Sequence, residues 1–219
     1  MTALDRLLAA VVFDMDGTLI DSTTVIPDAY IACVEALGGP VYTREQVIDA
    51  YSVGPPEAML THLLGRASSA REVDDYHARL AAAARGVTVY PGIKEMLATL
   101  ERHVLLAVFT GASIRACHIL LGAAGLLAHF KVLVGADEVA RSKPHPDGIF
   151  LACERLGVPA ASTAYVGDSP NDLEAARRSD ALVLAAGWGH QYRADAPSDM
   201  VLREPGDLLT LIGSVGETR

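Results

Sequence analysis

The 219-residue chain contains few cysteines, and this shortage excludes some classes of protein. Its three cysteines, Cys33, Cys117 and Cys153, lie far apart and form no C-x-x-C pair. This pattern argues against a disulfide framework and against a cysteine zinc site, and it favours buried free thiols in a reducing compartment. We therefore expect a cytoplasmic protein.

The chain also lacks basic runs and long hydrophobic runs. Its formal net charge is −9 and its pI is near 5.2, which disfavours nucleic acid or an anionic membrane surface as a partner. The apolar stretch 7–13 is too short to span a membrane, and no positively charged segment precedes it, so we predict neither a signal peptide nor a membrane span. Hydrophobic residues make up 51% of the chain, which is enough for a sizeable core.

Short apolar runs of strand character recur along the chain, with helical patterns between them. The strand-like runs end at Phe13, Phe109, Val134 and Val166, and a weaker run covers 181–186. Helices are predicted over 92–103, from Ser113 to Leu121, over 147–156 and from Pro170 onward. Strands that alternate with helices indicate an α/β protein with a Rossmann-like parallel sheet and helices on both faces.

One segment breaks this rhythm, because 22–85 shows amphipathic helical patterns and no convincing strand. The signals are a helix over 25–37, capping boxes at Thr43-x-x-Gln46 and Ser69-x-x-Glu72, and a helix from Pro55-Pro56 through Leu64. Helices packed directly on the sheet are the alternative, but a crossover of about 65 residues is far longer than usual. We predict a catalytic core formed by 1–20 and 87–219, and an all-helical cap domain formed by 21–86, called the helical insert below.

Two carboxylates, Asp14 and Asp16, follow directly after the first strand-like run. A buried strand end is an unfavourable place for unpaired negative charges, so a cationic partner is expected there. Three further strand ends supply useful groups: Thr110-Gly111, Lys143 and Asp168. Because parallel strands place their carboxyl ends at one edge of the sheet, all of these residues are predicted to converge on one site.

This set of residues is typical of phosphoryl transfer. Carboxylates at Asp14 and Asp168, with a backbone carbonyl and water, suit Mg²⁺. Asp14 can attack phosphorus to form an aspartyl-phosphate, and Asp16 can protonate the leaving oxygen and then activate water. Thr110 and Gly111 can hold phosphate oxygens, while Lys143 supplies positive charge to nucleophile and phosphate.

Four segments carry a resemblance to a known family: Asp14-Met15-Asp16-Gly17-Thr18, Thr110-Gly111, Lys143-Pro144 and Gly167-Asp168-Ser169-Pro170-Asn171-Asp172. In this order they resemble the four motifs of the haloacid dehalogenase superfamily, whose first type of cap sits where the helical insert lies. The resemblance implies Asp14 as nucleophile and metal ligand, Asp16 as acid/base and as a metal ligand through its backbone carbonyl, and Asp168 as a further ligand. It leaves open whether Asp172 ligates the metal directly.

Within that superfamily, Asp16 disfavours the dehalogenases, which resemble this chain but lack an acid there. Val53-Gly54-Pro55-Pro56 and Gly187-Trp188-Gly189 look similar to phosphoglycolate phosphatase-like members, which implies a small phosphorylated metabolite as substrate. Glycolate would require a cation for its carboxylate, and Arg44, His62 and Arg66 are the candidates.

Three alternatives remain open at this point: a phosphosugar mutase resembling β-phosphoglucomutase, a pyrophosphatase, and a receiver-type signalling domain. The sequence leaves the oligomeric state open between monomer and homodimer.

Overall fold

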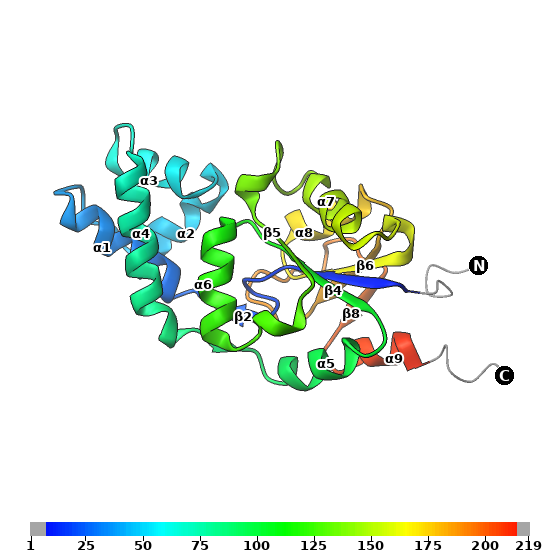
Figure 1. The fold of residues 1–219 in the computed structure, drawn as a ribbon. Coiled ribbons are helices and arrows are strands. Elements are labelled where there is room, and N and C mark those ends of the chain that lie inside the picture. The colour runs from blue at the N-terminus through cyan, green and yellow to red at the C-terminus, as the bar shows by residue number, and fades with distance from the viewer. Residues whose placement is uncertain (1–7, 214–219) are drawn as a thin grey trace.

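The computed structural model describes residues 8–213, and its centre is a six-stranded sheet in which every neighbouring pair is parallel. The strand order is β5-β4-β1-β6-β7-β8 (Figure 1). The strands are β1 (Ala10–Phe13), β4 (Leu105–Phe109), β5 (Val132–Val134), β6 (Thr163–Gly167), β7 (Leu182–Ala186) and β8 (Met200–Leu202). The predicted parallel α/β fold is confirmed.

Helices cover both faces of this sheet. Alternation along β1 sends Val11 and Phe13 to one face and Val12 to the other. The first face packs against α5 (Ile93–Leu100), α6 (Ile114–Ala124) and α9 (Asp207–Gly213), and the second against α7 (Asp147–Leu156) and α8 (Pro170–Arg177). Burial on both faces explains why the central strands are continuous apolar runs rather than alternating ones.

Four α-helices make up the helical insert, and they gather beside the sheet at the left of Figure 1. They are α1 (Val25–Ala36), α2 (Arg44–Asp49), α3 (Pro56–Leu64) and α4 (Ala70–Ala83), with the 3₁₀ turns η2 (Ala50–Val53) and η3 (Ala84–Gly86). Both predicted capping boxes are formed, by Thr43 with Gln46 and by Ser69 with Glu72. As predicted, 22–85 contains no strand.

A short antiparallel pair of strands, which the sequence did not predict, joins the two chain segments that lead into and out of the insert. It consists of β2 (Ile20–Asp21) and β3 (Thr88–Val89), with Ile20 opposite Val89 and Asp21 opposite Thr88. Beyond this pair, α4 packs against α6 of the core. The predicted boundary at 20/21 falls within β2, and the one at 86/87 falls just before β3. The division into two domains stays a prediction.

The remaining elements are the 3₁₀ turns η4 (Leu127–His129), η5 (Ala136–Glu138) and η6 (Ala160–Ser162). All three cysteines are buried free thiols, as predicted. Burial raises the pKa of the Cys33 thiol to about 11, so this thiol stays protonated. Within residues 8–213, each helix is too short or too polar to cross a lipid bilayer.

Candidate active site

The site begins where β1 ends, at the buried residue Asp14. Its backbone N–H donates to the carbonyl oxygen of Val166 on β6 (2.8 Å), which fixes Asp14 at the centre of the sheet edge. The chain turns at Gly17, which adopts a left-handed conformation with φ of 87°. Asp16 lines the same cavity as Asp14.

Lys143 links two carboxylates at this edge. Its Nζ lies 2.5 Å from Oδ1 of Asp14 and 2.6 Å from Oδ1 of Asp172, and only 8% of the side chain is exposed. Burial alone would lower the pKa of the amine, but the two carboxylates outweigh burial and raise it. Lys143 is therefore a fixed positive charge inside the site.

Asp168, which follows β6, accepts a hydrogen bond from a backbone N–H and lies against two glycines. Its Oδ2 accepts a hydrogen bond from the N–H of Gln191 (2.8 Å), while its Oδ1 is buried without a partner among the described residues. A Cβ placed on Gly17 would lie 2.3 Å from Asp168 Oδ2, and one on Gly189 would lie 2.2 Å from Asp168 Cβ. Only glycine leaves room for the Asp168 side chain at these two positions.

Asp172, in the first turn of α8, has both carboxylate oxygens engaged. Oδ1 accepts from the Tyr165 hydroxyl (3.1 Å) and from Lys143, and Oδ2 accepts from the Ser169 N–H (3.0 Å) and hydroxyl (2.5 Å). Sequence reasoning missed Tyr165 because its side chain comes from the middle of a buried strand. The capping-box spacing from Ser169 to Asp172 was a visible signal for the second contact.

The side chains of Asp14, Asp168 and Asp172 form a buried acidic cluster, with one oxygen of each within 4.8 Å of the others. Burial, with the charge of Asp172 adding to it, raises the pKa of Asp14 well above its usual value, although Lys143 opposes this rise. The same two causes raise the pKa of Asp168 to about 7. Three buried carboxylates around a single lysine fit a divalent cation, and the unpartnered Oδ1 of Asp168 is an available ligand atom.

Asp16 lies in a different environment from this cluster. Its Oδ1 accepts a hydrogen bond from the hydroxyl of Ser22, at the start of the helical insert. Burial raises the pKa of Asp16 to about 6, although the Ser22 hydrogen bond opposes the shift. A carboxyl group with such a pKa can carry a proton in mildly acidic solution and release it near neutrality.

The loop after β4, which neighbours β1 in the sheet, lines the same cavity as Asp14 and Asp16. Thr110 is buried, its Oγ1 accepts from the N–H of Ala112 (3.1 Å), and both Thr110 and Gly111 line the cavity. Ser113 caps α6 by accepting from the N–H of Ala116 (3.2 Å). The loop thus points toward the start of a helix, which is a favourable place for an anion.

These groups open into a cavity of about 520 Å³ between the sheet edge and the helical insert. From the sheet edge, Asp14, Asp16, Thr110, Gly111, Lys143 and Asp172 line it. From the insert, the wall includes Ile26, Tyr30, Ile48, Asp49, Tyr51, Met59 and Tyr76. The sequence-predicted residues of the first three motifs therefore line one cavity, and Asp168 belongs to the same acidic cluster as Asp14.

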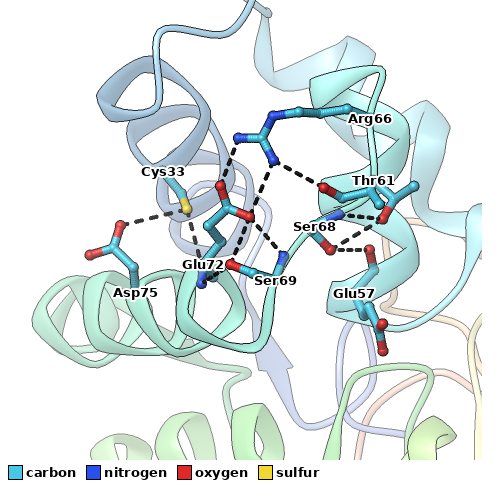
Figure 2. A network of polar contacts seen from close by, with 9 residues as sticks. Cys33, Glu57, Thr61, Arg66, Ser68, Ser69, Glu72 and Asp75 are labelled. Atoms are coloured by element: carbon cyan, nitrogen blue, oxygen red, sulfur yellow. Dashed lines mark hydrogen bonds and ion pairs between the residues drawn. The ribbon is translucent and has the colours of Figure 1, made fainter.

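The three predicted candidates for carboxylate recognition lie elsewhere. Arg44 pairs with Asp28 (2.6 Å), and His62 is exposed on α3. Figure 2 shows Arg66 reaching to Glu72 (2.6 Å), which in turn caps α4 through Ser69. None of the three lines the cavity within the part of the chain described.

The geometry defines a class of protein, namely an α/β protein with a buried cluster of aspartates beside one lysine at the carboxyl edge of a parallel sheet. Residues 8–180 match the family model of the haloacid dehalogenase-like hydrolases. The chain therefore belongs to this family, and the resemblance inferred from its motifs is confirmed.

Curated relatives cover nearly the whole chain. The N-acetylmuramic acid 6-phosphate phosphatase of Pseudomonas aeruginosa is 32% identical, over 94% of this chain and 95% of its own length. The phosphoglycolate phosphatase of Chromobacterium violaceum is 31% identical, over 94% of this chain and 96% of its own. Among solved structures, CbbY from Rhodobacter sphaeroides in complex with phosphate has a TM-score of 0.81 and 25% identity, over 94% of this chain and 99% of that one.

Proposed function

We propose that this hydrolase is an Mg²⁺-dependent phosphatase that cleaves a small phosphorylated metabolite through an aspartyl-phosphate on Asp14. The observation that carries the proposal is the acidic cluster of Asp14, Asp168 and Asp172 around Lys143, open to a cavity. The names of the relatives support phosphomonoester hydrolysis.

The nucleophile is the carboxylate of Asp14, the acidic residue of the cluster that lines the cavity directly after β1. An Asp14 oxygen attacks phosphorus, the bond from phosphorus to the leaving oxygen breaks, and that oxygen takes the proton carried by Asp16. Asp16 then accepts a proton from a water molecule whose oxygen attacks phosphorus; the bond from phosphorus to Asp14 breaks, the Asp14 carboxylate is restored, and inorganic phosphate leaves. The pKa of about 6 for Asp16 suits a group that must both give and receive a proton.

Lys143, Thr110 and Gly111 bind and orient the phosphoryl group. The Lys143 amine lies against Asp14 and is held in place by Asp172, so its charge sits beside the phosphate oxygens during transfer. The Thr110 hydroxyl and the backbone N–H of Gly111 supply further donors, whereas the Thr110 N–H is already bonded to the Val134 carbonyl.

The residues that would hold Mg²⁺ are Asp14 and Asp168 through their side chains and Asp16 through its backbone carbonyl. When bound, the ion offsets the repulsion between an anionic nucleophile and an anionic phosphate. Asp172 already uses both of its oxygens on Tyr165, Lys143 and Ser169, so we assign it to positioning Lys143 rather than to direct ligation.

Phosphate release from glucose 6-phosphate, phosphoglycolate and methyl phosphate, measured with Mg²⁺ and with EDTA, tests this proposal. We expect turnover that needs the ion, loss of at least a thousandfold in Asp14→Asn, and covalent phosphate on Asp14 in acid-quenched wild-type enzyme. Unchanged turnover in Asp14→Asn would refute it. A long-lived phosphoprotein that releases no phosphate would instead favour a receiver-type function.

A phosphosugar mutase is less well supported, because it must hold a second phosphate at the far end of its substrate. Such a group requires a cation in the helical insert, and the lining residues in the described part of the insert include none. Pyrophosphate as substrate meets the same difficulty.

A further inference from the structure

The wall that the helical insert gives to the cavity carries no positive charge. Among the lining residues in 8–213, the basic ones are Lys143 and His190, and both come from the sheet edge. Arg44 and Arg66 flank the lining segment 48–59 in the sequence, but neither lines the cavity. They form ion pairs with Asp28 and Glu72 instead. A leaving group that carries a carboxylate would therefore lose water without gaining a cation from the insert.

Asp49 adds negative charge at the mouth of this cavity. It is the last residue of α2, its side chain is exposed, and it lines the opening. A carboxylate repels another anion, whereas it accepts hydrogen bonds from the hydroxyl groups of a neutral ligand. The entrance thus disfavours acids and accommodates alcohols.

Tyr51 places an unsatisfied hydroxyl in the same wall. This tyrosine in η2 lines the cavity, and its buried hydroxyl has no hydrogen-bond partner among the described residues. Burial raises the pKa of Tyr51, so the group stays a neutral O–H that can both donate and accept. An unpaired buried hydroxyl is unfavourable, and a bound ligand with its own hydroxyl would satisfy it.

Two further tyrosines make the wall apolar. The rings of Tyr30 (α1) and Tyr76 (α4) stack on each other with their centroids 4.0 Å apart and their planes 19° apart, and both residues line the cavity although only 3% and 2% of their surface is exposed. Met59 and Ile26 extend this apolar surface. A buried apolar wall suits the C–H groups of a ligand, while hydroxyl groups of the ligand can reach Tyr51 and Asp49.

The volume also leaves room for a ring. A cavity of about 520 Å³ lies within the range of pockets that bind small organic molecules, about 300–1,000 Å³. A phosphorylated monosaccharide therefore fits in this cavity.

Taken together, these observations lead us to propose that the substrate is a phosphomonoester whose leaving group is an uncharged, hydroxylated ring of monosaccharide size, with the Tyr51 hydroxyl as its hydrogen-bond partner and Asp49 excluding acids. The inference rests on the proposed phosphatase function of the same site. It makes Tyr51 and Asp49 specificity-determining residues, distinct from the residues that contact the phosphoryl group.

The first test compares kcat/KM of the wild-type enzyme for four phosphomonoesters with Mg²⁺. Glucose 6-phosphate has an uncharged ring, phosphoglycolate an anionic leaving group, phosphocholine a cationic one, and methyl phosphate no ring. We expect glucose 6-phosphate to exceed each of the other three by at least tenfold. An equal or higher value for phosphoglycolate or phosphocholine overturns the inference, because the wall would then accept a charge.

The second test compares Tyr51→Phe with Tyr42→Phe as a matched control. The Tyr42 hydroxyl donates to the Leu63 carbonyl (2.8 Å), and Tyr42 does not line the cavity. Tyr51→Phe should lower the ratio of kcat/KM for glucose 6-phosphate to that for phosphoglycolate by about tenfold, since a buried polar partner is lost. Tyr42→Phe should change this ratio less than twofold. Equal ratios in the two variants overturn the role of Tyr51.

Asp49→Lys supplies an independent measurement that does not depend on the folding of Tyr51→Phe. It should raise kcat/KM for phosphoglycolate relative to glucose 6-phosphate by at least fivefold at low salt, and the gain should shrink at high salt because Asp49 is exposed. An unchanged ratio contradicts the role of Asp49. If no phosphomonoester at all is hydrolysed, the proposed function itself fails, and this outcome is distinct from hydrolysis with the wrong preference.

Discussion

Replacing Lys143 with methionine should destabilise the protein severely. The substitution keeps most of the side-chain volume but removes the charge that lies 2.5 Å from Asp14 and 2.6 Å from Asp172. Removing one member of a buried ion pair leaves an uncompensated charge and costs about 3–5 kcal/mol. For a protein of this size, that loss corresponds to a fall in Tm of about 6–20 °C.

The pH dependence of this loss gives a second readout. Burial already raises the pKa of Asp14 in the folded protein, and without Lys143 this pKa rises further. A carboxyl group with a raised pKa binds its proton more tightly in the folded state, so the stability of the variant increases as pH falls. The deficit relative to wild type should therefore be larger at pH 8 than at pH 5.

Urea unfolding in EDTA at both pH values measures the two effects. Lys131→Met is the matched control, because Lys131 is exposed and its loss should change the unfolding free energy by about 0.5 kcal/mol or less. A deficit below about 1 kcal/mol for Lys143→Met at pH 8, or one that does not change with pH, would refute the reasoning about the buried charges.

Three further predictions concern the cation site and the helical insert. Gly189→Ala places a Cβ 2.2 Å from Asp168 Cβ, so it should weaken Mg²⁺ binding measured by calorimetry at least tenfold. Gly122→Ala, where a Cβ meets nothing within 4 Å, should leave binding unchanged. Adding Mg²⁺ at a hundred times its Kd should stabilise the wild-type protein against urea by about 2.7 kcal/mol, and Asp168→Asn should lose most of this gain. Ser69→Ala removes the side-chain cap of α4 and should lower the unfolding free energy by about 1 kcal/mol, which thermal unfolding can measure.

The sequence predicts best what depends on local patterns. Asp14 and Asp168 could be placed together because each directly follows an apolar run that has to be a buried strand, and parallel strands share one edge. Lys143 lies further from its strand, in the loop beyond β5 and the turn η5. The helices of the insert were predictable from their caps, as at Thr43 and Ser69.

Elements with weak local signals were missed. Strand β8 is an apolar run of only three residues, and Val201 in its middle is 42% exposed, so its local signal is weak. Helix α9 (Asp207–Gly213) is short and was not predicted either. Strand β8 pairs with β7, and α9 packs against α5, so both elements depend on tertiary contacts rather than on local sequence.

The residues with which the helical insert lines the cavity were not predicted, for a related reason. Tyr30, Tyr51 and Tyr76 come from α1, η2 and α4, and they share no motif or spacing. Their common place on the cavity depends on how these elements pack. The hydrogen bond to Oδ1 of Asp172 likewise comes from Tyr165, which a reading of motifs alone treats as a core residue.

The antiparallel pair of β2 and β3 has a consequence for protein engineering. Because Asp21 is held opposite Thr88, the two ends of the insert lie side by side, about 5 Å apart as paired strands are. Any helical segment whose ends are equally close could be grafted between these positions without pulling on β1. Exchange of this one segment would then change which leaving groups the cavity accepts, while Asp14 keeps its position.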